Sequence, residues 1–306
     1  MVTRLAAAVL PFLAFLGLSP LLLGAVTRVK SLFAGRTGAP LLQPYHDLRR
    51  LLGKQPVYSR TTTWVFRAGP LVGLGAVVAA GLLMSFGGAP ALLPFPGDFI
   101  LFASLLGLSR FATALAALDT GSSFEGMGAA REVTFAAFAE PALFLCLVAL
   151  VRATGSLSLS GMLREGLPEL WRAQGPALLL AATALVVVAL AENARIPVDD
   201  PTTHLELTMI HEVMVLDHSG PDLAVIHYAA SLKLFLFGAL VVRLALGFPF
   251  SSPWPSLGVF LGGMALFATA LGAIESTMAR LRLDRVPQLL VAASVLALFA
   301  LVLLLR

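Results

Sequence analysis

The chain has 306 residues, of which 58% are hydrophobic and 12% are charged, and its formal net charge is +4. Soluble domains carry about 25% charged residues, so a soluble fold could not bury this much apolar surface. Several apolar runs reach the roughly 20 residues that a membrane-spanning helix needs. The composition therefore predicts an all-α, polytopic membrane helix bundle. The excess of basic residues then reflects which loops face the cytoplasm, and no nucleic-acid partner is expected.

The apolar runs follow one another along the whole chain. The first run is longer than the core of a signal peptide, and basic residues follow it, so we interpret it as a retained span. In chain order the predicted spans are 5–26, 68–87, 98–118, 134–152, 174–191, 224–247, 257–277 and 286–305. We find no internal repeat and no soluble insertion. The sequence therefore predicts about eight transmembrane helices in a single integral membrane domain, 1–306.

The basic residues gather between spans. The segment 27–67 holds eight of them and 280–285 holds three, so the positive-inside rule places both loops in the cytoplasm and both termini outside. Within the first loop, residues 45–52 predict a short amphipathic helix with Leu48, Leu51 and Leu52 on one face. This helix could rest on anionic headgroups, or it could be a docking surface for a cytoplasmic partner.

The sequence contains none of the common motifs that bind redox cofactors. The single cysteine, Cys146, lies inside an apolar span, so thiolate ligation of an iron–sulfur cluster or zinc is excluded. Glycine-rich nucleotide motifs and a haem-attachment motif are also absent. Any redox cofactor would therefore lie in partner subunits.

Three ionisable residues are predicted at a similar depth within the membrane. Counting about 1.5 Å per helical residue, Arg110, Glu140 and Lys233 lie two to three turns from the cytoplasmic ends of their spans. Unpaired charges there are costly, so we expect them to face the bundle interior and to pair or to line a wet cavity. A fixed ion pair that locks the helices together is one interpretation. A path for protons is the other, and the further carboxylates near the same end favour it.

The longest polar stretch is the loop 191–201, followed by a predicted helix over 202–216. Asp200 as N-cap and Pro201 at the first helical position indicate the helix start. In that helix Glu206 falls within the apolar stripe, which predicts that its carboxylate points into the bundle and exchanges protons. His204 and His211 fall on the opposite face, where we expect a partner protein or lipid headgroups. Their spacing does not suit a zinc site, so a metal site is set aside.

Four blocks of sequence resemble the membrane subunit shared by respiratory complex I (its subunit 1) and the group 4 membrane-bound nickel–iron hydrogenases. They are 35–48 (GRTGAPLLQPYHDL), 124–134 (FEGMGAAREVT) with 139–142 (AEPA), 191–212 (AENARIPVDDPTTHLELTMIHE) and 275–287 (ESTMARLRLDRVP). The third block departs from the complex I form and is similar to the hydrogenase branch, such as formate hydrogenlyase subunit 4 and hydrogenase-4 component C.

The resemblance implies a polar path and names its residues. Its carboxylates are Glu132, Glu140, Glu192, Asp199 and Glu206, with Arg131 and Arg195 as ion partners; depth alone adds Arg110 and Lys233. The implied function is that of a membrane-anchor and proton-coupling subunit of a multisubunit hydrogenase or complex I-like complex, in the cell inner membrane.

The resemblance also implies partners. Hydrogenase large and small subunits and iron–sulfur subunits would dock at the cytoplasmic face and hold the NiFe centre and the iron–sulfur clusters, with antiporter-like subunits beside the chain in the bilayer. One alternative is the quinone-site membrane subunit of a NADH:quinone oxidoreductase. Another is a stand-alone transporter, which predicts repeat symmetry and paired broken helices that the sequence lacks.

Overall fold

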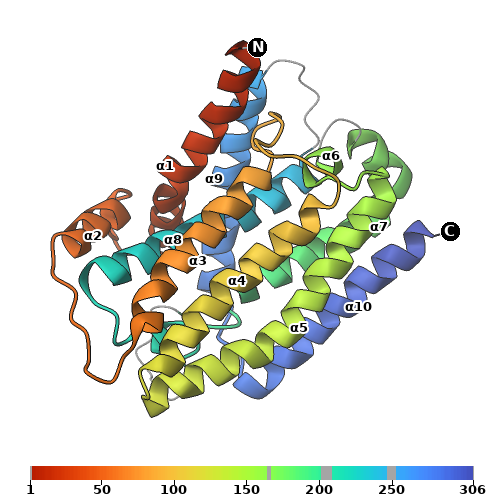
Figure 1. The fold of residues 1–306 in the computed structure, drawn as a ribbon. Coiled ribbons are helices and arrows are strands. Elements are labelled where there is room, and N and C mark those ends of the chain that lie inside the picture. Colours follow the sequence, from red (N-terminus) through yellow and green to blue (C-terminus); the bar gives the residue numbers. More distant parts are fainter. Residues whose placement is uncertain (1, 164–166, 201–208, 247–252, 306) are drawn as a thin grey trace.

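The structure is a computed structural model that describes residues 2–163, 167–200, 209–246 and 253–305 (Figure 1). Within these ranges the regular elements are all helices, and eight of them are long and apolar enough to cross a membrane. These eight are α1 (Val2–Phe33), α3 (Trp64–Leu83), α4 (Asp98–Asp119), α5 (Ser123–Thr154), α7 (Leu167–Glu192), α8 (Gly220–Ala245), α9 (Pro253–Thr277) and α10 (Val286–Leu304). The predicted all-α membrane bundle is confirmed.

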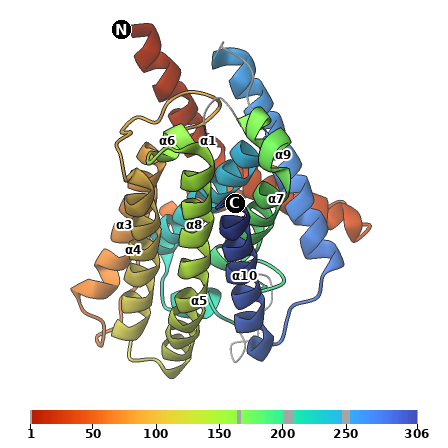
Figure 2. The same ribbon diagram turned by 90° about the vertical axis from the view of Figure 1, so that its right-hand side faces the viewer.

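The spanning helices form one packed bundle (Figures 1 and 2). α3 lies along α4, α10 lies along α5 and α7, and α1 packs on α9 and α8. α8 runs obliquely through the bundle and contacts α1, α3, α7 and α9. Four phenylalanines form its aromatic centre: Phe15 stacks on Phe86 at 5.1 Å between ring centroids, and Phe235 lies 6.1 Å from Phe260. This core encloses the middle of α8.

Two tyrosines donate hydrogen bonds to neighbouring carbonyls of α1, one of which a proline leaves free. Pro20 has no N–H, so the carbonyl of Leu16, one turn earlier, loses its helical donor. The hydroxyl of Tyr228 donates to this carbonyl at 2.9 Å, and the hydroxyl of Tyr45 donates to the neighbouring carbonyl of Gly17. The carbonyl that Pro20 leaves free thus attaches α8 to α1, and the carbonyl of Gly17 attaches the first loop.

The first loop carries the predicted amphipathic helix. α2 (Gln43–Leu52) begins with a proline in its first turn and packs on α8 and α1 at the end of the bundle that holds the basic loops. We call this end the basic end; the positive-inside rule assigns it to the cytoplasm. Leu48 and Leu51 face a cavity beneath α2, whereas Leu52 is 59% exposed. The helix is as predicted, but its three leucines do not share one environment.

The predicted helix over 202–216 is wrong in the part that the structure describes. Residues 209–219 contain only a short 3-10 turn, η1 (Glu212–Val215), and Leu216, predicted for the apolar stripe, is 49% exposed. Pro201, His204 and Glu206 lie outside the described residues, so their predicted helix start, face and inward direction are not described either.

Side chains replace the helical hydrogen bonds of this segment. The buried carboxylate of Asp199 accepts from the N–H groups of Ile210 and His211, and Glu125 accepts from the N–H of Asp217 at 3.0 Å. A Cβ at Gly128 of α5 would lie 2.4 Å from the Val213 side chain, so glycine permits the close approach. Tertiary contacts thus override a helical pattern.

An aromatic stack attaches the end of the segment to α3. The imidazole of His218 lies parallel to the Phe66 ring, with 3.9 Å between ring centroids, and is buried. Burial lowers the pKa of His218 below its ordinary value, while Asp222 and Asp217 oppose that change. The imidazole is therefore neutral at pH 7.

Acidification should loosen this attachment. Because the buried imidazole has a lowered pKa, the opened segment binds more protons than the closed one once the pH falls below about 6.5. Amides of residues 217–219 should lose hydrogen-exchange protection between pH 7.5 and 5.5, after correction for the intrinsic pH dependence of exchange. His218→Gln should abolish this response, and His46→Gln, on the exposed side of α2, should keep it. If His218→Gln still lost hydrogen-exchange protection on acidification, protonation of His218 could not be the cause.

Candidate functional site

One arginine within the bundle contacts three carboxylates. Arg110 of α4 places Nη2 2.7 Å from Oε1 of Glu192, the last residue of α7. Its Nη1 lies 3.3 Å from Oε1 of Glu140, and its Nε lies 3.7 Å from Oε1 of Glu132, both on α5. Only the contact with Glu192 is a hydrogen bond. Glu192 is therefore held firmly, whereas Glu132 and Glu140 are held loosely.

A second cation joins the cluster from α8. Lys233 Nζ lies 2.9 Å from Oε2 of Glu192, so this carboxylate, 1% exposed, sits between two cations. We call Arg110, Glu132, Glu140, Glu192 and Lys233 the Arg110 cluster. Its ion pairs join side chains from four helices, and among the described residues they match two cations with three carboxylates.

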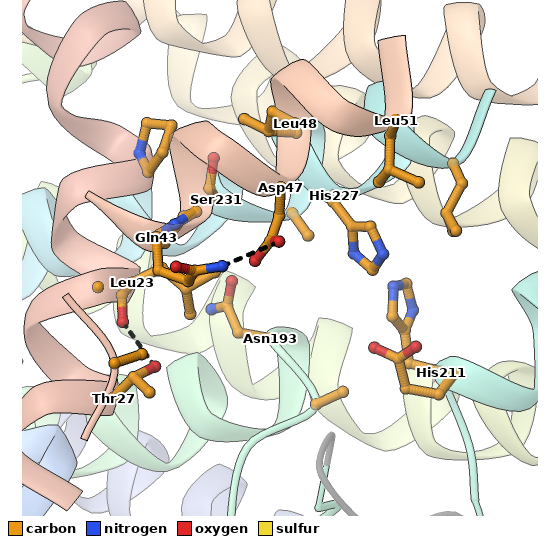
Figure 3. Close-up of a pocket in the computed structure, with 18 of the residues that line it drawn as sticks. Leu23, Thr27, Gln43, Asp47, Leu48, Leu51, Asn193, His211, His227 and Ser231 are labelled. Carbon is orange, nitrogen blue, oxygen red and sulfur yellow. Dashed lines mark hydrogen bonds between the residues drawn. The ribbon is translucent and has the colours of Figure 1, made fainter. Parts of the chain in front are cut away.

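Cavities connect this cluster to the basic end. A cavity of about 80 Å³ is lined by four members of the cluster and, beyond them, by Asn193, Arg195 and His211. The same three residues line a larger cavity of about 560 Å³ (Figure 3). The two cavities therefore meet at the loop that follows α7. His211 lines both cavities, and its predicted contact with a partner protein or headgroups stays a prediction.

The larger cavity lies between α1, α2 and α8. Figure 3 shows Leu23 and Leu48 among its apolar walls, with Asp47 and His227 pointing inward from α2 and α8. Gln43 donates to the Asp47 carboxylate at 3.1 Å. The cavity thus combines an apolar wall with hydrogen-bonding groups, which is typical of a small-molecule site.

A second ion cluster borders the cavities. Glu275 at the end of α9, fully buried, lies 2.9 Å from Lys30 Nζ and 3.3 Å from Arg195 Nη1. Arg195 is among the site residues predicted from the sequence, whereas Glu275 and Lys30 are not. A carboxylate in the last turn of an apolar helix opposes the helix dipole, and this signal could have found Glu275.

The remaining predicted residues lie around these clusters. Asp199 is buried and pairs with Arg280 at 2.9 Å. Arg131 donates to the carbonyl of Met209 at 2.9 Å and so supports the segment described above. Glu140 differs from expectation: it contacts Arg110, but 47% of its side chain is exposed, so this chain does not enclose it.

The arrangement places polar and ionisable side chains along one course, which the shared lining of the two cavities defines. It begins at the large cavity of the basic end, passes Asn193, Arg195 and His211, and reaches the Arg110 cluster. It ends at Glu140 on the surface of the bundle, between α4 and α5. Such a line can carry protons or hold charge.

Solved structures show the same fold. A chain of the membrane-bound sulfane sulfur reductase, described as an archaeal respiratory membrane complex, superposes with a TM-score of 0.79 at 22% identity, covering 97% of this chain and 99% of that one.

Curated relatives extend the similarity to sequence. Formate hydrogenlyase subunit 4 of Escherichia coli K12 is 30% identical over 90% of this chain and 91% of its own length, and hydrogenase-4 component C of the same organism is 30% identical over 76% and 72%. A NADH-quinone oxidoreductase subunit of Rubrobacter xylanophilus is 28% identical over 85% and 81%. The family model described as NADH dehydrogenase matches residues 5–305, so the chain is a multi-pass membrane protein that belongs to this family.

Proposed function

We propose that the protein is the membrane-anchor and proton-coupling subunit of a multisubunit hydrogenase or complex I-like respiratory complex in the cell inner membrane. The observation that carries this proposal is the line of cavities and ion pairs from the basic end to Glu140. Membership of a family with subunits of formate hydrogenlyase and NADH-quinone oxidoreductase supports it.

The charges of the Arg110 cluster favour proton exchange. Two cations and three carboxylates leave one negative charge, which is costly within a bilayer unless a carboxylate is protonated. Glu192 has two close cations, so the exchangeable proton is better assigned to Glu132 or Glu140, which Arg110 holds loosely. The cluster would thus gain and lose a proton during turnover.

The exposure of Glu140 indicates a neighbour in the membrane. A carboxylate on a spanning helix is costly against lipid, and such residues almost always face protein or water. We therefore assign the surface between α4 and α5 to an adjoining membrane subunit of the antiporter-like type. Glu140 would pass its proton to a polar group of that subunit.

The basic end would dock the peripheral redox module. α2 presents Arg49, Arg50 and Leu52 outward beside the opening of the large cavity. We propose that hydrogenase large and small subunits and iron–sulfur subunits bind here. These partners would hold the NiFe centre and the iron–sulfur clusters, so electron transfer would occur outside this chain.

Purification of the tagged protein in mild detergent, with mass spectrometry of what accompanies it, tests this function. A nickel–iron large subunit together with iron–sulfur and antiporter-like subunits would support the proposal. A flavin- and NADH-binding module would assign the chain to a NADH dehydrogenase instead. A protein that purifies alone and transports ions in liposomes would overturn the proposal.

A quinone site is the second candidate function, because the large cavity combines apolar walls with inward polar side chains. Under this alternative a quinone headgroup would hydrogen-bond near His227 and Asp47. If the chain serves a hydrogenase, quinone analogues should leave turnover of the assembled complex unchanged. Inhibition that weakens at least about tenfold in His227→Phe, but not in His46→Phe, would favour the quinone site.

Neutralising the loosely held carboxylates should uncouple proton movement from electron transfer. Glu132→Gln and Glu140→Gln should each leave assembly intact and lower the initial rate of proton translocation at least about tenfold, because positioned proton-transfer groups commonly contribute about 10²–10⁴ in rate. The measurement is dye-reported acidification of vesicles, normalised to electron flux. Glu169→Gln, exposed on α7, is the matched control. Unchanged coupling in both variants would contradict the proton path.

Glu192 should behave differently, because it balances two cations. Glu192→Gln leaves Arg110 and Lys233 without their shared partner, and breaking a buried ion pair costs about 3–5 kcal/mol. The variant should accumulate poorly and melt at lower temperature in detergent. Adding Lys233→Met should restore part of that loss. Equal stability of Glu192→Gln and wild type would show that the cluster is not organised around this carboxylate.

A further inference from the structure

A groove of different character lies on the membrane-facing side of the bundle. It has a volume of about 260 Å³ and runs between α7 and α9, with α8 as its floor. Its walls are aliphatic and aromatic side chains, including Leu190, Val241, Leu246, Leu266, Phe267 and Ile274. Arg195 lies at its basic end and is the one charged residue among the described residues that line it.

The dimensions of the groove suit a hydrocarbon chain. On α9 it extends from Gly263 to Ile274, which corresponds to about 16 Å at 1.5 Å per residue. Its volume over that length, with the radius of a contacting atom added on each side, gives a groove roughly 7 Å wide between its wall atoms. A helix with its side chains is about 10 Å across, so a spanning helix of another subunit is too thick to enter. One acyl chain is a better match.

The chemistry of the walls leads to the same ligand. The groove is parallel to the spanning helices and lies within the hydrophobic part of α7, α8 and α9. A narrow void in this position leaves its lining atoms without contacts on one side, and an acyl chain of the surrounding bilayer restores them. A soluble polar ligand would gain nothing from walls that offer it no hydrogen bonds.

Basic residues follow α9 at the basic end of the bundle, the end at which the headgroup of such a lipid would lie. The loop 278–285 crosses from the end of α9 to α10, and the N–H of Leu281 donates to the carbonyl of Pro197 at 2.8 Å, next to Arg195. Arg282 is 77% exposed and pairs with Asp284 in its own loop, a surface contact worth little. Arg285 is also exposed. Basic residues at a membrane surface attract anionic lipids.

We infer that the groove between α7, α8 and α9 binds one phospholipid with an anionic headgroup. One acyl chain fills the groove, and the phosphate lies at the basic end against Arg282 and Arg285. This site meets the proposed proton path only at Arg195 and does not rest on the function proposed above. The lipid seals the side of the bundle at Arg195, which the groove shares with the polar cavities.

Native mass spectrometry with two defined lipids tests the inference. The tagged protein, with any subunits that accompany it, is reconstituted with equal amounts of phosphatidylglycerol and phosphatidylethanolamine. Ala270 lines the groove and is exposed, so Ala270→Trp should fill it; Ala265→Trp, exposed on another face of α9, is the control. Wild type and control should retain one phosphatidylglycerol after activation, and Ala270→Trp should lose it at least about fivefold more readily.

A second variant tests whether the two arginines bind the lipid headgroup. Arg282→Gln with Arg285→Gln should keep a bound phospholipid but lose the preference for phosphatidylglycerol. An unchanged preference would overturn the assignment of the headgroup. Equal retention by Ala270→Trp and Ala265→Trp would show that the lipid binds elsewhere, and would overturn the site.

A measurement on the wild-type protein tests the site without a substitution that could disturb folding. Phosphatidylglycerol with a diazirine in one acyl chain should crosslink to peptides of α8 and α9 that line the groove. Labelling spread evenly over all exposed helices would contradict a specific site. A segment of another subunit that blocks crosslinking from the groove would contradict it as well.

Discussion

The contact between Arg110 and Glu192 is the interaction on which the rest of the site depends. It joins the middle of α4 to the end of α7, and through Glu192 it also holds Lys233 of α8. A buried charge without its partner costs several kcal/mol, so this contact fixes how far the loop after α7 can move from the bundle. That loop carries Asn193 and Arg195, which line both polar cavities.

The firm contact with Glu192 leaves the other carboxylates of the cluster loosely held. Arg110 makes no hydrogen bond to Glu132 or Glu140 in this structure, and the cluster keeps one negative charge that a proton can neutralise. A balanced ion pair would hold the helices of the bundle together and would have no tendency to bind a proton. The Arg110 cluster carries an excess negative charge and has cavities beside it. We therefore propose that it is part of a route for protons, which ends at Glu140 on the surface of the bundle.

Much of the fold followed from hydrophobic length alone, because eight runs of apolar residues can satisfy their backbone in a membrane only as helices. Depth counting placed Arg110, Glu140 and Lys233 together correctly, since each sits on a regular spanning helix. The segment after Asp199 was different. Its described part is held by the side chains of Asp199 and Glu125 in place of a helical ladder, and no periodicity in the sequence reports such distant contacts. Cavities and the partners of Glu275 also depend on packing that a single sequence does not encode locally.

The most direct measurement is the protonation state of the cluster in the assembled complex. Infrared difference spectra between the oxidised and reduced states report the carbonyl stretch of a protonated carboxylic acid. The account predicts a redox-dependent band that Glu132→Gln or Glu140→Gln removes and Glu169→Gln leaves in place. A spectrum without such a band, or a band that all three variants retain, would contradict the claim that the Arg110 cluster exchanges a proton.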